Sequence, residues 1–221
     1  MSQQYLIVVL ATCAVVFGFV LYFRLWYRKK RTEALGLVAQ ELRLSFMPEG
    51  DEVLMSALAG FHLFSRGHSK KIRNLLGGVI KDRKVQAFDY NYTIGHGKEQ
   101  HIHRQTVVCF EVPSRLPSFS LQPERLWHKI GEWLGRKDIN FDSHPDFSKK
   151  YLLRGSDEIA IRRLFSARAL EFFEGHPGVC VEGDANMLIL YRGSTQVKPE
   201  AIQPFIDEGF AVLGAFRDAW S

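Results

Sequence analysis

The sequence predicts an α+β protein in which an N-terminal transmembrane helix leads into a mostly antiparallel sheet with helices packed on it. Three observations predict this fold class. The chain begins with a long apolar run, it continues with short runs of alternating polarity that are typical of strands, and apolar residues recur at helical spacing between them. About 190 residues follow the apolar run, enough for one well-buried core or two small lobes.

The apolar run YLIVVLATCAVVFGFVLYF, residues 5–23, contains nineteen residues and no charge. At the rise of an α-helix it covers about 28 Å, the hydrocarbon thickness of a bilayer. A cleaved signal peptide would need a basic start and a shorter core, and a lipoprotein signal at Cys13 would not tolerate Thr12. A buried core helix would not be followed directly by basic residues. We therefore expect a transmembrane anchor over residues 5–27.

Aromatic and basic residues follow the run, as they do where a helix leaves a membrane. The preceding segment MSQQ contains no basic residue, so the positive-inside rule places residues 1–4 outside and the C-terminal side in the cytoplasm. The prediction is a single-pass protein of the cytoplasmic membrane. Its predicted membrane-interface residues are Arg24, Trp26, Tyr27, Arg28, Lys29, Lys30 and Arg31.

The net charge of +5 lies entirely in this basic segment. All 24 acidic residues and 24 of the 29 basic residues lie beyond Arg31, and 24 − 24 leaves that part formally neutral. The excess charge faces anionic lipid, at about 1 kcal/mol per basic residue near the surface. The lipid bilayer is therefore the expected partner, and nucleic acid is not.

The three cysteines do not suggest a disulfide framework. Cys13 lies in the span, whereas Cys109 and Cys180 fall in predicted strands. Because disulfides are rare in the cytosol, we expect all three to be reduced.

Residues 28–46 are predicted to form the basic juxtamembrane segment and a helix with an apolar face of Leu35, Val38, Ala39 and Leu42. The cytoplasmic α+β domain then spans residues 47–221. Asp51 can cap a short helix that runs to Ala59 and packs Val53, Leu54 and Leu58. The expected strands are 61–64, 74–80, 84–94 and 100–112.

The second half alternates again between strands and helices. The sequence predicts strands at 118–121 and 151–154, a helix from Pro123 to Leu134, and a helix capped by Ser156 or Asp157 that restarts near Ser166. Residues 179–182 and 187–192 are predicted to form a hairpin across Gly183–Asn186. The last helix begins near Pro199, and its apolar stripe is predicted to be core: Ile202, Phe205, Ile206, Phe210, Leu213, Phe216 and Trp220.

One internal similarity leaves two interpretations open. Residues 121–132 (LQPERLWHKIGE) and 197–208 (VKPEAIQPFIDE) align without gaps. They are either two independent strand-to-helix junctions with the same local chemistry or the trace of a duplication. A duplication would divide the domain into similar halves, 47–140 and 141–221.

The segment FDYNYTIGHGKEQHIHRQTVVCFEV, residues 88–112, is predicted to be a β-hairpin with its turn at His96–Gly97. In this register partner numbers add up to 193. Tyr92 then faces His101, Tyr90 faces His103, and Asp89 faces Arg104, a pairing of opposite charges.

His101 and His103 point to the same side of this hairpin and could share a metal ion. A third ligand is missing from that face, and stacking of histidine on tyrosine explains the same residues without an ion. We therefore predict a structural hairpin, with a pH-sensitive surface as the alternative. Neither catalytic residues nor a cofactor follow from any motif in the chain.

The motifs LFSRG (63–67), FDYNYTIGHGK (88–98), QTVV (105–108), LPSFSLQPE (116–124), DINF (138–141) and FSKKYLLRGSDEIAIRRLF (147–165) occur in this order. They resemble those of a family of uncharacterised bacterial membrane-anchored proteins. The resemblance covers nearly the whole domain and implies a bacterial cytoplasmic membrane, but it carries no activity or ligand.

Three functions remain under consideration. The first is an interaction or accessory domain that serves a membrane protein complex. The second is a small-ligand or lipid-binding sensor with a pocket between the sheet and the last helix. An enzyme acting at the membrane is the third. The predicted ligand or partner surface consists of Phe88, Tyr90, Tyr92, His101, His103 and Trp127.

Overall fold

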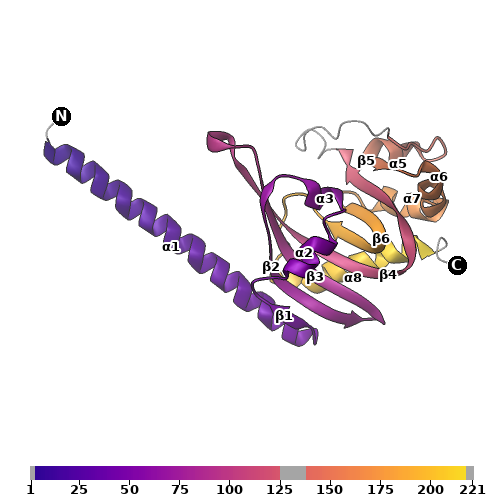
Figure 1. The fold of residues 1–221 in the computed structure, drawn as a ribbon, viewed down its shortest axis with the longest axis horizontal. Coiled ribbons are helices and arrows are strands. Elements are labelled where there is room, and N and C mark those ends of the chain that lie inside the picture. Colours follow the sequence, from indigo (N-terminus) through magenta and orange to yellow (C-terminus); the bar gives the residue numbers. More distant parts are fainter. Residues whose placement is uncertain (1–2, 125–137, 218–221) are drawn as a thin grey trace.

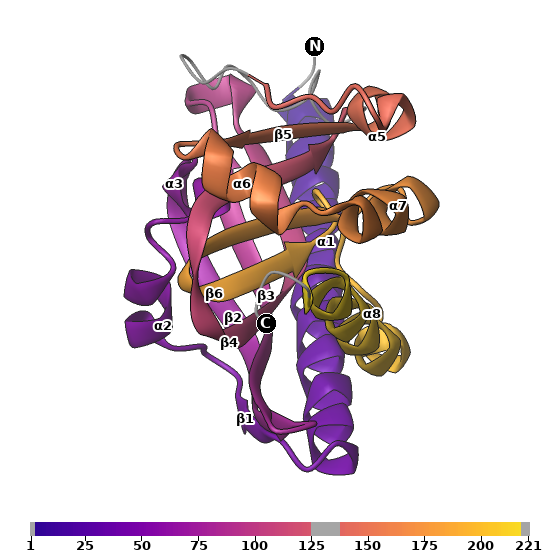
Figure 2. The same ribbon diagram turned by 90° about the vertical axis from the view of Figure 1, so that its right-hand side faces the viewer.

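In the computed structural model, which describes residues 3–124 and 138–217, an antiparallel sheet carries helices on both faces (Figures 1 and 2). A long helix precedes the sheet and projects away from it (Figure 1). The predicted α+β class is therefore confirmed.

Helix α1 (Gln3–Glu41) is one continuous helix of 39 residues. From Val9 onward it is long and apolar enough to cross a membrane. Its last turns pack on the sheet through Leu35 and Ala39, which are buried, so the predicted apolar face is confirmed. The helix ends earlier than predicted because Arg43 adopts a left-handed φ of 56° and the Leu44 N–H donates to the Ala39 carbonyl.

Within residues 3–124 and 138–217 the sheet has six strands in the order β1-β2-β3-β4-β5, and β6 pairs with β4. The long strand β4 pairs with β3 along its first part, with β5 at its end and with β6 from Val107 to Leu121. The division into halves 47–140 and 141–221 stays a prediction, and the β4–β6 pairing joins the two segments directly. The strands are β1 (Ser45–Met47), β2 (His68–Ile80), β3 (Arg83–Ile94), β4 (His101–Pro123), β5 (Tyr151–Gly155) and β6 (Cys180–Tyr191).

The helices form two layers, each with its own apolar core (Figure 2). Helices α2 (Glu52–Ala57) and α3 (His62–Ser65) cover one face. The other face is covered by the end of α1 together with α5 (Pro145–Lys150), α6 (Glu158–Leu164), α7 (Ala167–Gly175), the 3-10 turn η2 (Pro199–Ala201) and α8 (Ile202–Ala215).

The predicted stripe on the last helix is core. Ile202, Phe205 and Ile206 are buried, as are Leu213 and Phe216. Phe210 is partly buried against the same core, and Trp220 lies outside the described residues. The predicted caps are also present, because the carboxylates of Asp51 and Asp157 accept the N–H groups of Val53 and Ala160.

Several predicted elements are wrong. Residues 61–64 were expected to be a strand, but His62–Ser65 form α3. The strands expected at 100–112 and 118–121 are one strand, β4. Val53 was expected to pack in the core and is exposed instead. The helix expected from Pro123 to Leu134 falls almost entirely outside the described residues.

The hairpin predicted across Gly183–Asn186 is instead the middle of the single strand β6. Ala185 has a φ of 48° and faces Leu116, where the β4–β6 register shifts. Gly183 serves close packing, because a Cβ there would lie 2.4 Å from the ring of Phe119. The glycine therefore marks a bulge and a close contact, not a turn.

The predicted register of the β3–β4 hairpin is also wrong, by two residues. Tyr92 pairs with His103 and Asp89 pairs with Thr106, so partner numbers add up to 195. The loop is longer than a two-residue turn because Gly95–Gln100 contains the 3-10 turn η1 (Gly97–Glu99). A shift of two keeps each side chain on its predicted face, but Asp89 loses Arg104 as its partner.

Gly209 on α8 tests the packing between this helix and the sheet. A Cβ at Gly209 would lie 2.3 Å from the Phe110 ring, whereas a Cβ at Gly214 of the same helix would meet nothing within 4 Å. We expect Gly209→Ala to lower the free energy of unfolding by roughly 1–3 kcal/mol through overpacking. Gly214→Ala should raise it by up to about 1 kcal/mol through helix propensity. Chemical unfolding of both variants measures the difference, and equal effects would contradict the packing.

Candidate functional site

The end of α1 is joined to the sheet by a buried ion pair. Arg31 donates from Nε to Oδ2 of Asp89 at 2.8 Å and from Nη2 to Oδ1 at 2.7 Å. The Arg31 side chain is 12% exposed and that of Asp89 is 2% exposed. Two parallel bonds between planar groups fix direction as well as distance.

Two polar side chains complete the set around Asp89. The Asn74 amide donates to Oδ2 at 2.9 Å, and the Thr106 hydroxyl donates to Oδ1 at 3.1 Å. Thr32 on α1 donates to the Asn74 amide oxygen at 2.8 Å. Asn74 lies at an irregularity of β2 and has a φ of 50°, which turns it toward this site. We call these five residues, Arg31, Thr32, Asn74, Asp89 and Thr106, the junction.

The junction changes the interpretation of the basic segment. Arg24, Arg28, Lys29 and Lys30 are exposed, as are Trp26 and Tyr27, and the ammonium of Lys30 lies 4.7 Å from the Trp26 ring centre. Arg31 was predicted to lie at the membrane interface with these residues, but its guanidinium is bound to Asp89 of the sheet. Sequence reasoning missed this contact since Asp89 had a plausible partner nearby in Arg104.

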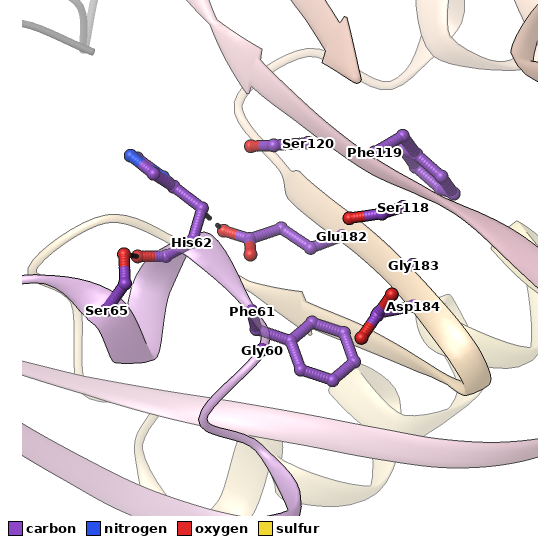
Figure 3. A pocket seen from close by; sticks show the side chains of 10 residues that line it. All are labelled: Gly60, Phe61, His62, Ser65, Ser118, Phe119, Ser120, Glu182, Gly183 and Asp184. Atoms are coloured by element: carbon purple, nitrogen blue, oxygen red, sulfur yellow. Dashed lines mark hydrogen bonds and ion pairs between the residues drawn. The ribbon is translucent and has the colours of Figure 1, made fainter. Parts of the chain in front are cut away.

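A second polar site lies on the opposite face of the sheet, between α3 and strands β4 and β6. It is a pocket of about 120 Å³ (Figure 3). Its polar side chains come from three elements, since His62 and Ser65 approach from α3, Ser118 and Ser120 from β4, and Glu182 and Asp184 from β6. Gly60, Phe61, Phe119 and Gly183 complete the lining.

Glu182 is the most buried carboxyl group of this pocket. It accepts the Leu63 N–H at 3.2 Å and the Tyr191 hydroxyl at 2.7 Å. Nδ1 of His62 lies 3.9 Å from Oε1, and the Gln122 amide donates to that nitrogen at 3.1 Å. Burial raises the pKa of Glu182 to about 7, although the bonds from Tyr191 and Leu63 oppose the shift.

This arrangement can exchange a proton near neutral pH and can hold water or a molecule of a few non-hydrogen atoms. Its clearest effect is structural, because Glu182 binds the backbone of α3 to the sheet. Sequence reasoning missed His62, Glu182 and Asp184 since it placed them in a strand and a hairpin that do not exist. A single acidic residue inside the apolar strand VCVEG was the signal that could have found the pocket.

The described residues of the predicted ligand or partner surface do not form one exposed surface. Phe88, Tyr90 and Tyr92 are buried in the core under α3, where the rings of Tyr90 and Phe64 lie 4.3 Å apart. His101 is exposed. Trp127 lies outside the described residues.

The predicted stacking of histidine on tyrosine exists with a different partner. The His103 ring stacks on Tyr92 at 4.9 Å, and its Nδ1 forms a hydrogen bond with the Ser194 hydroxyl at 2.7 Å. Burial lowers the pKa of His103, and the nearby Arg66 adds to the shift. Across residues 3–124 and 138–217, no group of three or more possible metal ligands gathers.

The cysteines of the domain, Cys109 and Cys180, are free and buried. Burial raises the pKa of the Cys109 thiol to about 12 and raises that of Cys180 as well. A thiolate is therefore disfavoured at both positions.

Replacement of Glu182 by glutamine tests the buried carboxyl group. Its pKa rises from 4.5 to about 7 on folding, so its contribution to stability is full below pH 4.5 and is lost as the pH rises through 7. The shift corresponds to about 3 kcal/mol. We expect Glu182→Gln to gain about this much stability relative to the natural chain between pH 4.5 and 8, as measured by chemical unfolding.

The control is Glu171→Gln on the exposed side of α7. It should differ from the natural chain by a constant amount over the same range. A constant difference for Glu182→Gln as well would contradict the raised pKa.

Removal of one partner tests the junction. Arg31→Met leaves Asp89 buried without a cation, so we expect a loss of about 3–5 kcal/mol in the free energy of unfolding. Lys29→Met, at an exposed neighbour, should change it by less than about 0.5 kcal/mol. The double variant Arg31→Met with Asp89→Leu should recover part of the loss, because a well-packed apolar pair replaces the charges. If Arg31→Met lowers the free energy of unfolding by less than about 1 kcal/mol, as is typical of ion pairs at the surface, the buried ion pair is contradicted.

The comparisons with known proteins give one informative result. No family model and no curated protein matches this chain. The crystal structure of the mycobacterial trehalose monomycolate transport factor A, TtfA, is similar with a TM-score of 0.60. The alignment is 13% identical and covers 85% of this chain and 93% of that chain. At this identity the likeness shows that the two proteins share a fold.

Proposed function

We propose that this chain is a membrane-anchored accessory protein whose domain lies on the cytoplasmic side and binds or supports a membrane protein complex. The observation that carries the proposal is the continuity of α1. A helix long and apolar enough to span a bilayer runs without interruption into the sheet and is bound there by the junction.

A rigid connection suits an accessory role better than a flexible tether does. A flexible linker only raises the local concentration of a domain near the membrane. Here the buried ion pair and the packing of Leu35 and Ala39 hold the domain in one orientation relative to α1. The same surface would then always face a neighbour in the membrane.

The orientation across the membrane follows from the basic residues after the span. Arg24, Arg28, Lys29 and Lys30 stay exposed and available to anionic lipid, which favours the cytoplasmic side for the domain. The charge distribution therefore supports a single-pass protein of the cytoplasmic membrane with its N-terminus outside.

The fold comparison supports this role from another direction. The similar structure belongs to a protein named as a transport factor for trehalose monomycolate. The shared fold is compatible with an accessory role for this chain at its own membrane.

A small-ligand sensor is the second candidate, and the polar pocket favours it over an enzyme. At the predicted location between the sheet and α8 the packing is tight around Gly209, because a Cβ there would lie 2.3 Å from the Phe110 ring. The pocket at Glu182 has about 120 Å³, far below the roughly 300 Å³ of a typical drug-sized site. It would suit a small polar molecule, not an acyl chain. Among the described residues, His62 and Glu182 are an acid–base pair that an enzyme could use, with Nδ1 and Oε1 3.9 Å apart.

Co-purification tests the accessory role. The tagged full chain is extracted from native membranes with a mild detergent after cross-linking, and its partners are identified by mass spectrometry. We expect an integral membrane protein to be enriched. The matched control carries residues 1–31 fused to an unrelated soluble protein, so it keeps the span and loses the domain. Recovery of the chain alone, or of the same proteins with the control, would contradict the proposal.

A further inference from the structure

We propose that the β3–β4 hairpin and the start of β2 form a second membrane contact, which binds anionic lipid headgroups of the leaflet that α1 leaves. This inference rests on the proposed function in one respect, namely that α1 spans the membrane. We call the contact, residues 66–73 and 95–104, the basic edge.

The two segments of the basic edge form one surface. His68 pairs with Thr93, and Lys71 pairs with Asn91. Nε2 of His68 forms a hydrogen bond with the Gly95 carbonyl at 3.0 Å, and the rings of His68 and His96 are stacked at 5.1 Å. The start of β2 therefore lies beside the hairpin tip.

The basic edge points toward the membrane side of the domain. In Figures 1 and 2 the hairpin tip extends past the other strands on the same side as the N-terminus of α1. The junction aligns the two elements, because Arg31 contacts Asp89. From Arg31 back to Arg24, the end of the apolar run, is about 10 Å along the helix.

Strand β3 extends farther from the junction than the about 10 Å between Arg31 and Arg24 on α1. From Asp89 to Ile94 is about 17 Å along the strand, before the loop adds to it. The hairpin tip can therefore reach the level at which α1 leaves the lipid.

The charge of the basic edge is strongly one-sided. It contains Arg66, Lys70, Lys71, Arg73, Lys98 and Arg104 against a single acidic residue, Glu99, so 6 − 1 gives +5. Because the chain beyond Arg31 is neutral, its remainder holds 18 basic and 23 acidic residues and carries −5. The neutral domain thus has its positive end toward the membrane.

Three of the six basic side chains are available for a partner. Lys71, Lys98 and Arg104 are exposed, and none of the ion pairs within residues 3–124 and 138–217 involves them. Ile102, next to the tip, is 57% exposed, although most large apolar side chains of the sheet are buried. Cations around one exposed aliphatic side chain suit the interface of an anionic bilayer.

The position of the basic edge favours lipid over other anionic partners. The exposed Arg24, Arg28, Lys29 and Lys30 lie on α1 at the same membrane level and carry the same sign. A bilayer surface is a plane that both groups can touch at once. The attraction falls off within about a Debye length of 8–10 Å, so only charges held close to the surface contribute.

The experiment places a fluorescent probe at the tip of the full chain in nanodiscs. Ile102→Cys is labelled with an environment-sensitive fluorophore in a Cys13→Ser background, since Cys109 and Cys180 are buried. The discs contain phosphatidylcholine alone or a mixture with phosphatidylglycerol, and lipids carrying a quencher report contact. The control is Val79→Cys, which is 69% exposed at the opposite end of β2.

We expect quenching at position 102 to be at least about twofold stronger in the anionic discs than in the neutral ones, as for electrostatic binding to lipid. Position 79 should show no quenching in either. Charge reversal by Lys71→Glu, Lys98→Glu and Arg104→Glu should remove the difference at position 102.

Equal quenching at position 102 in both lipids, or none in either, would overturn the proposal. So would a probe that responds to added RNA or an acidic peptide but not to anionic lipid. Co-elution of the chain with the discs tests the span separately, and the search for a protein partner does not enter this measurement.

Discussion

The buried carboxylate of Asp89 is the constraint on which the arrangement of this molecule depends. It lies on β3 in the middle of the sheet and accepts hydrogen bonds from α1, β2 and β4, through Arg31, Asn74 and Thr106. A buried ion pair adds little net stability compared with an apolar contact, but it penalises every arrangement in which the charge loses its partner. The junction therefore selects one orientation of α1, which Leu35 and Ala39 then stabilise by burial of apolar area.

The two faces of the sheet carry different helices and differ in the side chains that they bury. One face carries α8, α7 and the end of α1 over an apolar core. The other face has an apolar core under α2 and α3, and beside α3 it holds the buried Glu182, which accepts hydrogen bonds from the Leu63 N–H and the Tyr191 hydroxyl. The strand β4 contributes to both faces and pairs with β3, β5 and β6. A displacement of the helices on one face would therefore displace those on the other.

Local patterns predicted what depends on local physics. Three features that need only neighbouring residues are present in the structure. They are the helix over the apolar run before Arg24, the caps at Asp51 and Asp157, and the apolar face of Leu35 and Ala39. The membrane itself remains a prediction. The predictions were wrong where the structure depends on contacts between segments that are far apart in the sequence.

Two positions show this clearly. Asp89 has Arg104 nearby in sequence, yet its partner is Arg31, 58 residues away. Gly183 looked like a turn because turns favour glycine, but it makes room for Phe119 on β4. The polar pocket needed both α3 and an uninterrupted β6, so a sequence interpretation that misplaced these elements could not bring His62 and Glu182 together.

The distribution of distances across the junction shows whether the domain is held rigidly on its anchor. A spin label at the native Cys13 on α1 and a second one at Val53→Cys, both exposed, can be compared in nanodiscs by pulsed electron paramagnetic resonance. A rigid junction should give a single narrow distance distribution that broadens when Asp89 is replaced by alanine. A broad distribution in the natural chain would show that the domain moves freely on α1 and that the junction does not hold it.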